Sequence, residues 1–273
     1  MPVRVPRDGS LERAWRCPGG LAATLTHYPG AGTHPLHVHD HLQVSFLLAG
    51  EMIEEVEGRE HFACAGGRGH KPAGARHRDS WGHQGVLMFT LRLWGPQERW
   101  EPGWVAGGTP AGIASLVRIF AQEVDSGRRE EAATDLLAGV PLSTSATGDP
   151  PAWLERARAA IHDAPKLLQI SEAAGEGGVN PTHLSRMFRR FYGMPPSIYR
   201  RRVLLARAAS ALVRSQAPLA QVAVQAGFFD QAHLSRVMRA ETGLTPAQAR
   251  AVLTGTDPYN TSMRASLLGL AKQ

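Results

Sequence analysis

Histidines provide the first chemical signal in the sequence, because nine of the twelve lie between His27 and His83. His37 and His39 are separated by one residue, and side chains alternate across a strand, so both imidazoles would face the same side. Imidazole nitrogens bind divalent transition metals, and the spacing would let both rings face one ion. Solvated histidines at strand ends, with nothing bound, are the alternative interpretation.

An arginine-bearing helix that occurs twice provides the second signal. Residues 182–193 read THLSRMFRRFYG, and residues 232–243 read AHLSRVMRAETG. In each copy the apolar residues recur at helical spacing and the arginines lie on other faces. Asn180 and Asp230 precede the two copies as N-caps. Each copy follows a short helix, over 170–176 or 219–226, and a glycine-containing turn, which is the pattern of a helix-turn-helix unit.

The repeated helices would read DNA with their exposed polar side chains. Residues near the N-terminus of a recognition helix reach base edges, whereas flanking and C-terminal arginines contact phosphates. The candidate base readers are Thr182, Ser185 and Arg186 in the first copy, and Gln231, His233, Ser235 and Arg236 in the second. The candidate phosphate contacts are Arg189, Arg190 and Arg239. Arginine pairs with guanine and glutamine with adenine. For His183, a packing or capping role and a DNA contact both stay open.

Charge is unevenly distributed along the chain. Residues 1–150 hold 14 lysines and arginines against 17 acidic residues, a net charge of −3, whereas residues 151–273 hold 16 against 7, a net charge of +9. This asymmetry favours double-stranded DNA as the partner of the C-terminal part, with a solvated basic surface as the alternative. The sequence has only two cysteines and contains no apolar run of membrane-spanning length, so we expect a cytoplasmic protein without a membrane partner.

The pattern of apolar residues predicts an α+β multidomain fold. Short apolar runs between Leu21 and Leu93, broken by glycine and proline, predict a β-barrel or sandwich. We expect a first domain over 1–138 with a helix at about 111–126, a linker over 139–151, an all-α DNA-binding domain over 152–254 and a tail over 255–273. A connecting helix over 197–214 would span about 27 Å, which is close to the roughly 34 Å between successive major grooves.

The C-terminal part resembles the AraC family of transcriptional regulators over about residues 153–250. The resemblance rests on QVAVQAGFFDQAHLSRVMRAETGLTPAQAR in the second unit and on PTHLSRMFRRFYGMPPSIYRRR in the first. It implies sequence-specific DNA binding through the residues named above, activation more often than repression, and RNA polymerase as a partner. It also implies a homodimer formed through an apolar stripe; packing within the chain is the alternative. The stripe consists of Ile113, Leu116, Val117, Phe120 and Val124.

The N-terminal part resembles the two motifs of the cupin barrel, in GTHPLHVHDHLQVSFLLAG and GGRGHKPAGARH. This resemblance assigns His37, His39 and Gln43 to the first motif and His77 to the second, around one divalent transition metal (Zn, Fe, Mn or Ni). Two positions depart from the motifs: Gln43 stands where the family usually has glutamate, and Trp81 where it usually has asparagine. A small organic effector bound in the barrel without metal is the alternative.

These observations together predict a transcriptional regulator, not an enzyme, that responds to a small-molecule effector bound in a cupin-like domain. Two alternatives stay open: a metal-dependent cupin enzyme fused to a DNA-binding domain, and a constitutive DNA-binding protein whose barrel is structural. Metal-dependent turnover would support the first. A DNA affinity that no small molecule changes would support the second.

Overall fold

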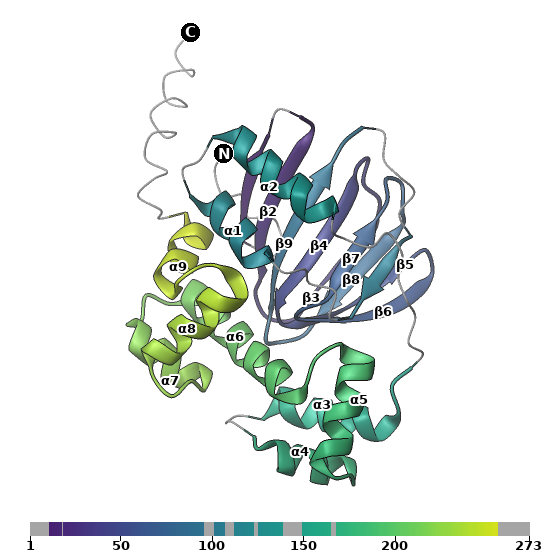
Figure 1. The fold of residues 1–273 in the computed structure, drawn as a ribbon, viewed down its shortest axis with the longest axis vertical. Coiled ribbons are helices and arrows are strands. Elements are labelled where there is room, and N and C mark those ends of the chain that lie inside the picture. Colours follow the sequence, from purple (N-terminus) through teal and green to yellow (C-terminus); the bar gives the residue numbers. More distant parts are fainter. Residues whose placement is uncertain are drawn as a thin grey trace.

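The computed structural model describes residues 11–17, 19–95, 101–106, 112–122, 125–138, 149–164 and 168–255. Within them, strands come first and helices follow (Figure 1). The strands are β1 (Leu11–Arg16), β2 (Leu21–Tyr28), β3 (Gly32–His37), β4 (Leu42–Ala49), β5 (Glu51–Val56), β6 (Arg59–Cys64), β7 (Arg68–Lys71), β8 (His77–Trp81), β9 (Val86–Leu93) and β10 (Gly103–Val105). The helices are α1 (Ile113–Ala121), α2 (Ser126–Ala138), α3 (Ala152–Asp163), α4 (Ile170–Gly177), α5 (Pro181–Tyr192), α6 (Pro196–Arg214), α7 (Leu219–Ala226), α8 (Gln231–Thr242) and α9 (Pro246–Thr254).

The strands form two antiparallel sheets that make a β-sandwich, and helices follow them, so the predicted α+β fold class is confirmed. One sheet has the order β1-β2-β9-β4-β7-β10, and the other has the order β3-β8-β5-β6. Gly50 makes the turn between β4 and β5 with φ +89°, and a Cβ there would lie 2.2 Å from the carbonyl oxygen of Gly85. Only glycine fits this crossing of two backbones.

Strand β4 is buried along its whole length because both of its faces are covered. Val44 and Phe46 pack into an apolar cluster with the helices that lie on the large sheet. On the opposite face, Gln43 donates from Nε2 to Ser45 Oγ (3.2 Å), and Ser45 Oγ lies 3.2 Å from Thr90 Oγ1. This part of the sandwich interior is therefore polar, although the outer face of the same strand is apolar.

Helix α1 corrects the prediction for residues 111–126. The expected helix ends earlier than predicted, since α1 ends at Ala121; α2 follows from Ser126, and Val124 lies outside the described residues. The other four stripe residues are buried within the chain, and Phe120 packs edge-on against Trp15 and Phe89 at centroid distances of 5.8 and 5.6 Å. These four residues therefore pack within their own chain, as the intramolecular alternative expects, and homodimer formation stays a prediction.

The C-terminal helices form the two predicted helix-turn-helix units, α4–α5 and α7–α8, which the 19-residue helix α6 joins. Residues 139–148 of the expected linker and 256–273 of the expected tail lie outside the described residues. One apolar cluster continues from the large sheet through α1 and α6 to α9, so the two expected domains pack against each other. Among the described residues, no helix has the length and apolar character needed to cross a membrane.

Candidate DNA-binding helices and the histidine cluster

Helix α5, the first predicted recognition helix, begins with residues that favour the N-terminus of a helix. Asn180 Oδ1 accepts a hydrogen bond from the backbone N–H of His183 (2.8 Å), and Pro181 occupies the first turn, where its missing N–H removes no helical bond. Leu184, Phe188 and Tyr192 are buried on one face. The opposite face is therefore fixed relative to the rest of the protein, and it carries the predicted base readers.

The structure places the predicted residues of α5 on this outer face. Thr182, Arg186, Arg189 and Arg190 are exposed, and Ser185 is half-buried. The ring of His183 lies against Trp153 at a centroid distance of 5.2 Å, and its Nδ1 is 3.0 Å from Arg186 Nη2. His183 therefore packs on α3 and orients the arginine beside it, which matches the packing alternative.

The second recognition helix, α8, repeats this arrangement. Asp230 Oδ1 accepts from the backbone N–H of His233 (2.6 Å). Gln231, Arg236 and Arg239 are exposed, Ser235 is half-buried, and the His233 ring packs edge-on against Phe228 at 5.2 Å. Sequence reasoning missed Phe229, which is 88% exposed directly before the N-cap. The two adjacent phenylalanines of AGFFDQ could have indicated an exposed aromatic residue, because the turn buries only one of them.

The arginines on the two recognition helices differ from those on α6 in their partners. Arg201 and Arg202 of α6 both pair with Glu241, at 3.1 and 2.9 Å. Within the described part of the chain, no ion pair is recorded for the recognition-helix arginines Arg186, Arg189, Arg190, Arg236 and Arg239. Exposed guanidinium groups without a carboxylate partner are suited to phosphates and to guanine edges.

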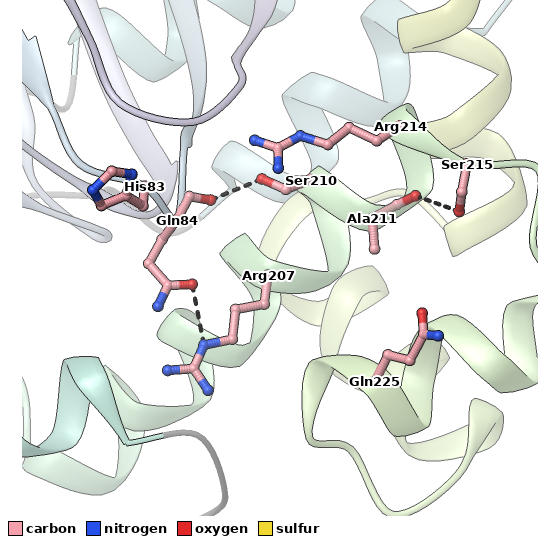
Figure 2. A pocket seen from close by; sticks show the side chains of 8 residues that line it. All are labelled: His83, Gln84, Arg207, Ser210, Ala211, Arg214, Ser215 and Gln225. Carbon is pink, nitrogen blue, oxygen red and sulfur yellow. Dashed lines mark hydrogen bonds between the residues drawn. The ribbon is translucent and has the colours of Figure 1, made fainter.

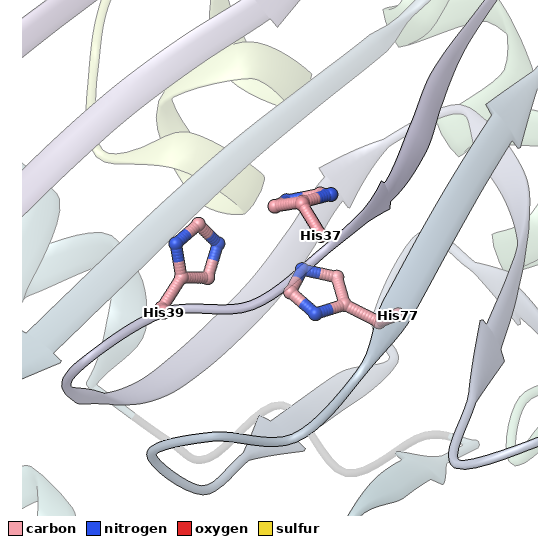
Figure 3. Close-up of side chains that lie close together, drawn as sticks. All are labelled: His37, His39 and His77. Atoms are coloured by element: carbon pink, nitrogen blue, oxygen red, sulfur yellow. The ribbon is translucent and has the colours of Figure 1, made fainter.

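The histidine cluster assembles as predicted for three of its four members (Figure 3). His37 ends β3, His39 lies in the following loop, His77 begins β8, and ligand nitrogens of all three lie within 4.8 Å of one another. Where β3 pairs with β8, His37 lies opposite His77, and a β-bulge between His34 and His37 shifts the register. Gln43 is buried at the start of β4, and its amide nitrogen donates to Ser45.

Burial favours the neutral form of two of the three imidazoles, those of His39 and His77. Desolvation, together with the neighbouring imidazoles, lowers the pKa of His39 to about 3. Desolvation and nearby Lys71 lower the pKa of His77 to about 4. Neutral imidazoles have a free lone pair, which is the form that binds metal. Beside His77 the sandwich buries a second group that sequence reasoning missed, built from Glu54, Lys71 and Asp79.

This second group combines opposite charges in the interior. Lys71 Nζ donates to Glu54 Oε1 (2.6 Å), and Trp104 Nε1 donates to Glu54 Oε2. Burial and the neighbouring Asp79 carboxylate raise the pKa of Glu54. Burial alone would also raise the pKa of Asp79, but hydrogen bonds with Glu54 and His34 hold it below its usual range. The interior next to the imidazoles is therefore polar and charged, unlike an apolar pocket.

A further set of contacts ties the helix-turn-helix units to the sandwich. Glu51 of β5 accepts two bonds from Arg158 Nη1 of α3 (2.8 and 2.7 Å) and one from Tyr199 Oη of α6 (2.6 Å). Arg202 Nη1 of α6 donates to the carbonyl of Ala65 (2.7 Å). No pattern in the sequence pointed to Glu51, because its partners are more than 100 residues away.

Two helix-turn-helix units joined by one helix, fused to a β-sandwich, define a DNA-binding transcriptional regulator rather than an enzyme. Residues 154–251 match the model of a family described as a helix-turn-helix domain. The chain is 31% identical over 83 residues to the probable transcription factor PqrA of Proteus vulgaris, covering 30% of this chain and 68% of that protein. It belongs to the AraC-type family of transcriptional regulators.

One further relative and one solved structure match over most of the chain. The arabinose operon regulatory protein of Escherichia coli K12 is 25% identical over an alignment of 234 positions, and the match covers 76% of this chain and 80% of that protein. The solved structure of ToxT from Vibrio cholerae, at 12% identity and a TM-score of 0.36, covers 88% of this chain and 98% of that one.

Proposed function

We propose that this protein is a ligand-responsive transcriptional regulator whose helices α5 and α8 read two blocks of one DNA site. The observation that carries the proposal is the pair of exposed recognition faces, with arginines that have no carboxylate partner among the described residues. Helix α6 has 19 residues and would span about 28 Å at 1.5 Å per residue. That length suits two recognition helices placed in successive major grooves.

A binding-site selection with the full chain tests this proposal. Arg186→Ala and Arg236→Ala should each weaken binding by about 1–3 kcal/mol and relax the preference only within one block. Arg189→Ala and Arg239→Ala should weaken all sequences equally and reduce the salt dependence. Arg128→Ala, an exposed arginine of α2, is the matched control. A single preferred block that does not depend on residue 236 would contradict the proposal for α8.

We propose that the effector binds in the sandwich together with one divalent transition metal held by His37, His39 and His77. The proposal is supported by three imidazoles whose ligand nitrogens lie within 4.8 Å of one another. Gln43 would contribute its amide oxygen as the fourth ligand. The ions that suit three imidazoles and an oxygen are Zn, Fe, Mn and Ni.

Metal analysis of protein purified without an affinity tag or chelator tests the metal site. His39→Ala combined with His77→Ala should abolish stoichiometric metal, whereas His83→Ala, an exposed histidine, should not. Gln43→Glu should tighten binding because a carboxylate adds negative charge. Protein without metal would leave an organic effector alone as the signal. DNA affinity that no small molecule changes would indicate a constitutive regulator.

The direction of regulation, contact with RNA polymerase and homodimer formation stay predictions from the family resemblance. Because the apolar stripe of α1 is buried within its own chain, a dimer would need a surface other than this stripe. Sedimentation of the full chain measures its mass directly.

A further inference from the structure

A pocket of about 380 Å³ lies where the sandwich meets both α6 and α7 (Figure 2). Arg207, Ser210 and Arg214 line it from α6, His83 and Gln84 from the turn before β9, and Gln225 from α7. Its volume falls within the range of roughly 300–1,000 Å³ that takes small organic ligands. The sandwich, the connecting helix and the second helix-turn-helix unit therefore share this one pocket.

The wall of the pocket is held by a chain of hydrogen bonds between the two parts of the protein. Ser210 Oγ donates to the Gln84 carbonyl (2.7 Å), so its oxygen accepts from Nε2 of the buried His27 (3.1 Å). Arg207 donates from Nε to Gln84 Oε1 (3.1 Å) and from Nη2 to the His162 carbonyl (2.7 Å). Helix α6 is thus fixed to the turn before β9, and the pocket is preformed.

The charge of the lining is positive. It contains two arginines and no carboxylate. Arg207 has only neutral acceptors as hydrogen-bond partners. Asp163 attracts it through its negative charge, but the two side chains form no ion pair within the described residues. Arg214 is exposed, and no hydrogen bond or ion pair of its guanidinium is recorded within the described ranges. A preformed polar pocket with an arginine free to pair favours an anionic ligand.

We propose that this pocket is a second ligand site, which binds a small organic anion through its carboxylate or phosphate group. Arg214 pairs with the acidic group, while Arg207, Gln84 and Gln225 contact the polar remainder. Such a ligand touches the sandwich, α6 and α7 together, so it stabilises their present arrangement. The site lies outside the sandwich interior, and neither the recognition faces nor the imidazole cluster contributes to it.

Thermal unfolding and calorimetric titration of the full chain with inorganic phosphate and with citrate, at constant ionic strength, test the proposal. At least one probe should raise the melting temperature saturably, because a ligand that binds only the folded state stabilises it. The response to each probe distinguishes a phosphate site from a carboxylate site. Arg214→Gln should weaken the affinity at least about tenfold, while Arg214→Lys should retain part of it.

Arg128→Gln, an exposed arginine of α2, is the matched control and should bind the probes like the unmodified protein. Arg214 is exposed, so its substitution should leave the fold intact. Equal affinity in Arg214→Gln, or no effect of either probe beyond that of chloride, would overturn the proposal. A loss of DNA affinity in Arg214→Gln without any change in probe binding would also overturn it, because DNA phosphate would then be the partner of Arg214.

Discussion

Replacing Glu51 by glutamine tests whether its contacts with α3 and α6 hold the DNA-binding helices on the sandwich. The side chains of Glu51 and Arg158 are only 17% and 15% exposed. Removing one partner of a buried ion pair costs about 3–5 kcal/mol. Arg158 keeps a second carboxylate, Glu155, at 3.0 Å, and the new amide can still accept from Tyr199. We therefore expect a loss of about 2 kcal/mol, between the values for buried and exposed pairs.

Thermal unfolding of the full chain measures this loss. For a protein of this size, about 2 kcal/mol lowers the melting temperature by about 4–8 °C. Glu55→Gln on the same strand is the matched control, because its partner Arg78 is 61% exposed and such pairs contribute less than about 1 kcal/mol. Glu51→Gln and Tyr199→Phe should be less than additive, since the first weakens the same bond that the second removes. A Glu51→Gln protein that melts like Glu55→Gln would refute the reasoning.

Three further substitutions test the packing, the electrostatics and a helix cap. Phe120→Ala should destabilise the protein by about 3–5 kcal/mol in denaturant unfolding, because the side chain is fully buried against Trp15 and Phe89; a small effect with loss of dimer mass would instead indicate a dimer contact. His27→Gln should reduce acid sensitivity: burial lowers the pKa of His27 to about 4, so the unfolded chain takes up the proton first as pH falls. The unmodified protein should lose about 2 kcal/mol more than the variant between pH 7 and pH 5, and equal losses would contradict this. Asp230→Ala removes the cap of α8 and should cost about 1 kcal/mol, which hydrogen exchange of the α8 amides measures; unchanged protection would show that the cap adds nothing.

The helices of the C-terminal part could be predicted closely because their signals are local. Asn180 and Asp230 mark the starts of α5 and α8, and the structure shows both capping bonds. The histidine cluster was accessible for a similar reason, since alternation and motif spacing bring His37, His39 and His77 together. Local signals do not show which surface covers an apolar face. The stripe of α1 has the same spacing whether it faces a second copy or its own sheet.

The contacts between the two parts could not be predicted, because they depend on how distant segments meet. Glu51 and Tyr199 are separated by 148 positions, and neither has a neighbour in sequence that marks it as a partner. The pocket beside Arg214 has the same origin. It needs a turn of the sandwich, one face of α6 and one residue of α7 in the same place.

Under the ligand control proposed above, helix α6 is the element that would connect a ligand to DNA binding, because it contacts the sandwich and joins the two helix-turn-helix units. The predicted readers Arg186 and Arg236 are exposed while α6 is bound to the sandwich, so the sandwich does not mask them. Control by simple covering of these arginines is therefore excluded for this arrangement. A ligand must instead change how α6 is held, and only a ligand that binds two arrangements with different affinity can shift the balance between them. Tyr199, Arg202 and Ser210 contact the sandwich along α6, whereas the two units that read DNA are attached to its ends. A change in those three contacts would alter how both units are held against the sandwich, while α6 itself sets the spacing of the recognition helices that a two-block DNA site would detect.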